Sequence, residues 1–494
     1  MMKPMSHKPA GLARIFGYAM GEGGISIAMN GVSNFALIFL TQVLGLGAGV
    51  AALALSITTL WDAITDPLMG YISDNTRTRL GRRQPYLLIG SLALAVSFFL
   101  LWFVPQQVTG EAAVFAVVLC INLLLRTAVT VFAVPFTALG FEICPDYEGR
   151  SRLQGVRFFI NQVVNFTFGA MAWTLFFRDE FSAEGERIDG TLIAGNYLLM
   201  GAVLAMAVLI MSLICIVSTW QYAKPYDDEV GDAGNSRSVA GFVREFGSIL
   251  RDRLALWVFG FFVVAQFAML LTAQMQLFTY VFFMEFSSSE KTFVHGAGML
   301  SFAVCSLFQS RLVARFDKKV CGYIGGGLSF FGGVGLYLVF IGGVLPADST
   351  WTVGGVAIPL SVGVFALLQS CWWGGGGVLV PLASSMIADV AAINYVNTGK
   401  LKNASYASVF TFCQKTSISI GLLLTGWLVA TAGIESGADE QTPEAVRNIA
   451  TLTFISGPVV IALALFILGR YPVDRAYMDD INRRTEEMEA KMKT

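Results

Sequence analysis

The sequence predicts an all-α membrane protein that crosses the bilayer many times, with its helices divided into two bundles of six. Three observations predict this fold class. Of the 494 residues, 55% are hydrophobic and only 14% are charged, whereas a soluble domain carries about 25% charged residues. The apolar residues form long runs. A polar stretch near the middle of the chain leaves as many runs before it as after it.

The apolar runs have the length of transmembrane helices, because a helix needs about 20 mainly apolar residues to cross the hydrocarbon of a bilayer. Twelve runs meet or approach that length. They are residues 12–42, 48–72, 86–104, 112–141, 154–177, 192–217, 255–285, 292–312, 320–343, 355–388, 403–432 and 447–470. Several are longer, so we expect those helices to tilt or to extend beyond the hydrocarbon.

The positions of Lys and Arg predict the orientation. If the N-terminus is inside, the outer loops hold only Arg178, Arg187, Lys291 and Arg447, and the other loops and ends carry many more basic residues. Basic residues are enriched in cytoplasmic loops. We therefore expect both termini to be cytoplasmic, in a multi-pass protein of the plasma (inner) membrane whose surroundings are the lipid bilayer.

The polar stretch 218–252 is predicted to be a cytoplasmic linker between the two bundles. The N-terminal bundle then covers residues 1–217, the C-terminal bundle 253–470 and a cytoplasmic tail 471–494. Two six-helix bundles related by an axis along the membrane normal are a common layout of transporters. The halves also resemble each other in charge: the basic turns "RTRLGRR" and "ARFDKK" follow the second and eighth helices.

Two glycine-rich segments, residues 325–335 and 374–377, resemble phosphate-binding loops only superficially. Neither follows a strand or ends in Lys-Ser or Lys-Thr. Small residues allow membrane helices to approach closely, so we expect both segments to lie at helix–helix contacts.

Two aspartates lie inside the second apolar run. Asp62 and Asp66 are four residues apart and so share one face of a helix. Two carboxylates at low dielectric cannot both be ionised cheaply, so one holds a proton or a cation lies between them. Pro67 leaves the carbonyl of Ala63 without its helical donor. The pattern favours a site for a proton or a small hard cation such as Na⁺; an aqueous cavity or an ion pair with Arg126 is the alternative.

Other charged residues lie within or beside apolar runs. Lys415 is thirteen residues from Lys402, about 15–20 Å along a helix, which is too far for easy snorkelling. We expect it to face the bundle interior and contact a solute or a carboxylate. Arg126 and Glu22 are predicted to pair with each other, to pair with Asp62 or to contact a ligand directly. For Arg157 three roles are open: a gate residue, a contact to the solute, or a basic residue that fixes the cytoplasmic end of its helix.

Three segments of the chain resemble the signature regions of a known transporter family. They are "WDAITDPLMGYISDNTRTRLGRRQP", "VPFTALGFEICPDYEGRSRLQGVRFF" and "SSMIADVAAINYVNTGKLKNASYASVFTFCQK". The family is the glycoside–pentoside–hexuronide:cation symporters, which are melibiose-permease-like members of the major facilitator superfamily. The resemblance runs from the first to the eleventh helix. It implies the major facilitator fold and alternating access around a central cavity.

The resemblance also implies roles for individual residues. Asp62 and Asp66 match the family's cation-binding carboxylates, Arg157 its sugar-binding arginine and Lys415 a lysine lining the same cavity. Trp373 lies two turns before the position at which the family has a stacking tryptophan, and it is a predicted substrate contact. The residues expected to close the cytoplasmic side through ion pairs are Asp74, Arg83, Glu142, Arg150, Asp389 and Lys400.

The chain departs from the family pattern around the sugar. Ala133 occupies the position of a helix-four carboxylate, Thr137 that of an aromatic residue, and Gly23, beside Glu22, that of a helix-one aspartate. The family's acidic sugar clamp is therefore not reproduced, and a proton fits the coupling site at least as well as sodium. Arg126 adds positive charge that could favour an acidic solute such as a uronide.

These features predict a secondary active transporter that couples H⁺ or Na⁺ to the symport of a sugar, glycoside or sugar acid. A transporter of an amphipathic or lipid-like solute is the first alternative. A non-transporting membrane sensor or scaffold would be expected to lose the acids of helix two and the charge of Lys415, yet both are present. We expect no enzymatic activity, because no nucleophile–base pair, metal-ligand cluster or phosphate loop is recognisable. We also expect no cofactor besides the coupling ion, no nucleic-acid partner and a monomer.

Overall fold

A computed structural model of the chain describes most of its residues, and they form two compact units. The described residues are 11–74, 76–103, 108–144, 147–181, 185, 187–222, 246–346, 349–353, 356–399, 403–438 and 440–493. Unit 1 contains Met1–Gly231, Ser287–Thr292 and Glu435–Glu440, and unit 2 contains Asp232–Phe286, Phe293–Ile434 and Gln441–Thr494. Most of the predicted linker, residues 223–245, lies outside the described residues.

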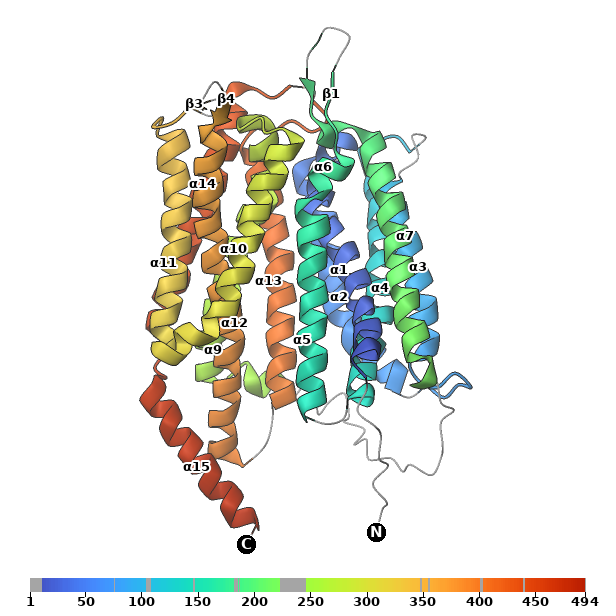
Figure 1. The fold of residues 1–494 in the computed structure, drawn as a ribbon, viewed down its shortest axis with the longest axis vertical. Coiled ribbons are helices and arrows are strands. Elements are labelled where there is room, and N and C mark those ends of the chain that lie inside the picture. Colours follow the sequence, from blue (N-terminus) through green and yellow to red (C-terminus); the bar gives the residue numbers. More distant parts are fainter. Residues whose placement is uncertain are drawn as a thin grey trace. The chain divides into compact units, whose positions relative to one another are not determined.

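Unit 1 is built from long helices and one short hairpin (Figure 1). Its elements are α1 (Leu12–Ile38), the π-helix η1 (Phe39–Val43), α2 (Ala48–Asp74), α3 (Gln84–Trp102), α4 (Glu111–Ile143), α5 (Tyr147–Val164), the π-helix η2 (Asn165–Ala170), α6 (Ala172–Phe176), β1 (Glu180–Phe181), β2 (Arg187–Ile188), the 3₁₀ turn η3 (Gly190–Leu192), α7 (Ala194–Thr219) and the 3₁₀ turn η4 (Trp220–Tyr222). Helix α1 packs against α5 and α7, and α4 packs against α2 and α3.

Unit 2 repeats the pattern of long helices. Its elements are α9 (Arg253–Phe278), the π-helix η5 (Thr279–Phe283), α10 (Ser288–Arg315), α11 (Lys318–Leu336), the π-helix η6 (Tyr337–Ile341), β3 (Thr350–Val353), β4 (Val356–Pro359), α12 (Leu360–Thr398), α13 (Asn403–Thr431), α14 (Pro443–Gly469) and α15 (Arg475–Lys493). The first turn of α10, up to Thr292, belongs to unit 1. There Lys291 is buried against Asp189, which precedes η3.

The all-helical, multi-span fold class is confirmed. Within the described residues, eleven helices are long and apolar enough to cross a membrane. The run predicted at 154–177 is not among them; it contains most of α5, the π-helix η2 and α6. Its first part carries several amide side chains that lower its hydropathy, and these prove to be part of the candidate site.

The prediction for the tenth run, residues 355–388, was wrong at both ends. The hairpin of β3 and β4 occupies the segment before residue 360, and α12 continues to Thr398. Hydropathy falls near Asp389, but helical hydrogen bonds do not depend on apolar side chains. The helix stops where Gly399 takes the left-handed conformation (φ +67°) that commonly ends a helix. The last helix begins at Pro443, a few residues before the apolar run 447–470, and its N-cap Thr442 accepts a hydrogen bond from Ala445 N.

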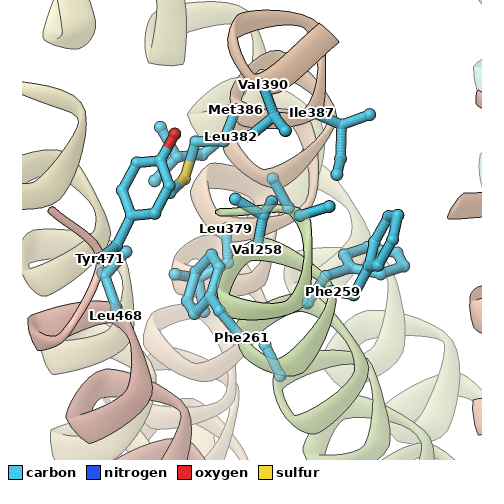
Figure 2. Close-up of a cluster of buried hydrophobic side chains, with 14 of the residues drawn as sticks. Val258, Phe259, Phe261, Leu379, Leu382, Met386, Ile387, Val390, Leu468 and Tyr471 are labelled. Atoms are coloured by element: carbon cyan, nitrogen blue, oxygen red, sulfur yellow. The ribbon is translucent and has the colours of Figure 1, made fainter. Parts of the chain in front are cut away.

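Helix α12 packs against α9 and α11 in unit 2. Figure 2 shows side chains of α9, α12 and the end of α14 gathered in one cluster. Glycine brings α12 close to α11, since a Cβ added at Gly375 would lie 2.2 Å from Gly325 O. This confirms the expectation that the glycine-rich segments serve helix contact. In lipid, such contacts stabilise through van der Waals packing, because the tails are as apolar as the side chains.

Candidate ion and solute site

The two intramembrane aspartates meet one hydroxyl group from α4. Thr130 Oγ1 is 3.0 Å from Asp62 Oδ1 and 2.8 Å from Asp66 Oδ1. Asp62 is 5% exposed, and Asp66 is partly buried. A threonine hydroxyl has one proton and can donate to only one carboxylate at a time. Two acceptor oxygens therefore converge on one hydroxyl, and a bound positive charge would relieve the repulsion between them. The geometry is therefore suited to binding a positive charge.

Arg126 lies beside this acid pair. Its Nη1 is 3.9 Å from Asp62 Oδ2, both side chains are 8% exposed, and its Nη2 is 3.4 Å from Thr59 Oγ1. Arg126 and Thr130 are one turn apart on α4, so one helix face supplies both groups. Of the pairings open to Arg126, the structure contains the one with Asp62. The distance exceeds the roughly 2.7–2.9 Å of a charge-assisted hydrogen bond, so the guanidinium compensates charge without a direct hydrogen bond to Asp62 at this contact.

A ladder of polar side chains joins α1 to α5 and η2. We call it the polar ladder, and its three rungs are Glu22 with Arg157, Ser26 with Asn161, and Asn30 with Asn165. On the first rung, Arg157 Nη2 and Nε donate to Glu22 Oε2 at 2.6 and 2.9 Å. On the second, Asn161 Nδ2 donates to Ser26 Oγ at 2.7 Å. Each partner follows the previous one by four residues, so the ladder runs along one face of both helices.

The side chains of the polar ladder's first rung are partly exposed. The side chains of Glu22 and Arg157 are 18% and 15% exposed, and the Arg157 guanidinium lies over the Phe136 ring at 4.9 Å. Amide, carboxylate and guanidinium groups together offer donors and acceptors that match hydroxyl groups. The sequence analysis singled out Glu22 and Arg157 but missed Asn30 and Asn165. The sequence did contain a pattern that could have predicted them, namely a polar residue at every fourth position of two apolar helices.

Two predicted solute contacts belong to unit 2. Lys415 lies near the middle of α13 and is partly buried. Trp373 lies on α12 and packs against α10, since a Cβ added at Gly298 would be 2.7 Å from Trp373 Cδ1. Unit 1 brings together Asp62, Asp66 and Arg126, and separately Glu22 with Arg157. Within unit 2, the roles of Lys415 and Trp373 stay predictions.

Ion pairs occur at several of the predicted gate positions. In unit 1, Arg83 Nε is 3.2 Å from Glu142 Oε1, and Arg83 Nη1 donates to Ser73 Oγ at 2.9 Å. In unit 2, Asp389 Oδ2 is 2.5 Å from Lys318 Nζ. Sequence reasoning did not place Lys318 among the gate residues. Asp74 lies in α2 and Arg150 in α5, but the structure does not describe their side chains. Lys400 lies outside the described residues.

Most of the chain matches one family of known proteins. Residues 17–475 match the family described as MFS/sugar transport protein. The putative glycoside/cation symporter YagG of Escherichia coli is 25% identical over 95% of this chain and 93% of its own. The human sodium-dependent lysophosphatidylcholine symporter 1 is 24% identical over 89% of this chain and 79% of its own.

A solved structure shows the same fold. The crystal structure of the nucleoside transporter NupG superimposes with a TM-score of 0.61 at 12% identity, covering 93% of this chain and 100% of the other. The family match covers nearly the whole chain, and the resemblance seen in the sequence is confirmed. The chain belongs to the MFS/sugar transport protein family of the major facilitator superfamily, and it is a cation-coupled, multi-pass membrane symporter, not an enzyme.

Proposed function

We propose that this symporter carries a sugar, glycoside or sugar acid together with one monovalent cation, H⁺ or Na⁺, by alternating access. The observation that carries the proposal is the contact of Thr130 with both Asp62 and Asp66 inside the membrane-spanning part of unit 1. Ionisable residues at such a depth are costly and are typical of ion pathways and binding sites.

The charge balance of the acid pair supports a single coupling ion. Asp62 and Asp66 contribute two negative charges when ionised, and Arg126 contributes one positive charge at 3.9 Å from Asp62. These three side chains then sum to one negative charge, which one monovalent cation would balance. Net charge at low dielectric is unfavourable, so cation binding would stabilise the states in which this cluster is closed to water.

The polar ladder supports a hydroxyl-rich solute. Its first rung offers Glu22 and Arg157, a partly buried pair that can accept from and donate to neighbouring hydroxyl groups. Arg157 would also pair with the carboxylate of a sugar acid, since guanidinium and carboxylate groups form strong, charge-assisted hydrogen bonds. We assign Lys415 and Trp373 to the part of the solute site contributed by unit 2. YagG, which is named as a glycoside/cation symporter, is a relative along almost the whole chain.

An amphipathic, lipid-like solute is the second candidate. A relative of similar identity is named as a lysophosphatidylcholine symporter. Arg157, stacked on Phe136, is a group suited to a phosphate head, because guanidinium binds phosphate in the same forked geometry as carboxylate.

We further propose that residues 1–217 and 253–470 are the two moving bundles and that both termini are cytoplasmic. The pairs Arg83–Glu142 and Lys318–Asp389 would then lie at the cytoplasmic ends of the helices. Their breaking and forming would accompany closure of that side.

The deciding experiment is uptake into proteoliposomes under an imposed Na⁺ or H⁺ gradient. A prior thermal-unfolding screen of the purified protein against sugars, glycosides, uronates and lysophospholipids would select the solutes, because a ligand stabilises the state that binds it. We expect a sugar-type ligand to raise the unfolding temperature and to accumulate only under a cation gradient. Stabilisation and uptake of lysophospholipids alone would select the second candidate, and gradient-independent equilibration of every ligand would contradict symport.

A further inference from the structure

Unit 2 contains a small internal cavity that the proposed function does not use. It has a volume of about 10 Å³ and lies among α9, α11, α12 and α14. Its polar lining comes from Thr272, Gln276, Gln369, Trp372 and Thr453. A cavity of roughly 10–15 Å³ holds one water molecule if two to four polar groups surround it.

Two groups in this lining have no hydrogen-bond partner among the described residues, namely Thr272 Oγ1 and Trp372 Nε1. Trp372 is 1% exposed and Thr272 is 8% exposed. The Thr272 hydroxyl and the Trp372 ring meet at one point, because a Cβ added at Gly457 would lie 2.6 Å from Thr272 Oγ1 and 2.3 Å from Trp372 Cη2. An unpartnered buried polar group is costly, and native structures usually satisfy it with protein or water.

The other polar groups of the lining have partners. Gln369 Nε2 donates to Gln276 Oε1 at 3.1 Å, and the Thr453 and Thr279 hydroxyls are 2.8 Å apart. A further acceptor comes from the backbone of α14. Pro458 has no N–H, so the carbonyl of Phe454, four residues earlier, lacks its usual helical donor.

The Phe454 carbonyl also lies next to the cavity. Its oxygen is 3.4 Å from the position of a Cβ at Gly333, and both residues line the cavity. A donor from Trp372, a hydroxyl from Thr272 and an acceptor from Phe454 therefore surround one small space.

We propose that this cavity is a binding site for one water molecule that links α9, α12 and α14. The water accepts a hydrogen bond from Trp372 Nε1 and donates to Phe454 O and Thr272 Oγ1. A cation does not suit the site, because the indole N–H presents a positive dipole and no carboxylate lines the cavity. An anion does not suit it either, because no lining side chain is basic.

The proposal is tested by whether Thr272→Val lowers or raises the unfolding temperature. Thr272→Val keeps the shape of the side chain and removes the hydroxyl. If water is bound, the variant takes away one of its partners, and we expect a lower unfolding temperature in detergent. If the cavity is dry, the variant removes a costly unpaired hydroxyl and the unfolding temperature rises. An unchanged or raised unfolding temperature would overturn the proposal.

Thr425→Val is the matched control. Thr425 is fully buried in α13, and its hydroxyl donates to Gly421 O within its own helix. We expect a smaller fall in unfolding temperature for this variant than for Thr272→Val. The second measurement needs no variant. A density map of the unaltered protein that resolves ordered water should contain a peak within hydrogen-bond distance of Thr272 Oγ1 and Trp372 Nε1, and a map without that peak would refute the site.

Discussion

The buried polar groups of the two units differ in kind. In unit 1, two ion pairs lie inside the spans, Asp62 with Arg126 and Glu22 with Arg157, beside the neutral rungs of the polar ladder. In unit 2, the buried network described between the spans is made of amides and hydroxyls, with Gln369 between Gln276 and Tyr280. Charged groups respond to ions and to charged solutes, whereas neutral groups mainly hold helices together. On our proposal, ion coupling belongs to unit 1, and we expect the unit 2 network to have a structural role.

The largest effect is expected for Asp66→Asn in unit 1. The amide cannot hold the coupling proton or offer a full negative charge to Na⁺, so gradient-driven accumulation should fall to background. Exchange of bound solute across the membrane should persist. Solute uptake into proteoliposomes measures both. Asp480→Asn, which changes an exposed acid of α15, is the control and should leave accumulation unchanged. Uphill transport by the Asp66 variant would remove the basis for placing coupling in unit 1.

Arg126→Leu should have the next largest effect. It leaves Asp62 buried without its positive neighbour, and breaking a buried ion pair typically costs about 3–5 kcal/mol in the free energy of unfolding. The unfolding temperature should fall and should become more dependent on added Na⁺ or on pH. Adding Asp62→Asn removes the negative charge that faced Arg126, so the double variant should regain most of the loss. If the double variant is no more stable than Arg126→Leu alone, Arg126 does not act as the counter-ion of Asp62.

Gln369→Leu tests the neutral network of unit 2. The substitution leaves Gln276 and Tyr280 without the amide between them, and a buried group that loses its partner costs about 1–3 kcal/mol. Thermal unfolding should report this loss, and the response of the protein to the coupling cation should not change. A variant that loses cation dependence would show that the two units do not divide these roles.

The smallest effect is expected at the ends of the helices. Lys318 and Asp389 are 25% and 15% exposed at their side chains, and partly exposed pairs contribute about 0.2–1 kcal/mol. Lys318→Gln should therefore lower the unfolding temperature only slightly, while changing the rate of solute exchange if the pair accompanies closure. Arg83→Gln is the matched variant in unit 1 and should cost more, because Arg83 is more buried and also donates to Ser73. Equal effects of the two variants would mean that burial does not distinguish the pairs.

Much of the candidate site was predictable because charge is rare in this chain. Asp62, Asp66 and Arg126 stood out as charges within apolar runs, and the pairing of Arg126 with Asp62 was one of the expected options. Thr130, which joins the two acids, was missed. A threonine within an apolar helix is ordinary, and no spacing rule relates a residue of α4 to one of α2.

The sequence by itself determined the fold class and most of the spans, because a membrane helix must satisfy its backbone internally and present apolar side chains to lipid. That requirement acts locally and is visible as a run of residues. The tertiary structure decided the division of the fifth run into α5, η2 and α6, the extension of α12 to Thr398, and the partners of each polar group. Those features depend on which faces of different helices meet, and contacts between distant segments leave no periodic signal in a single sequence.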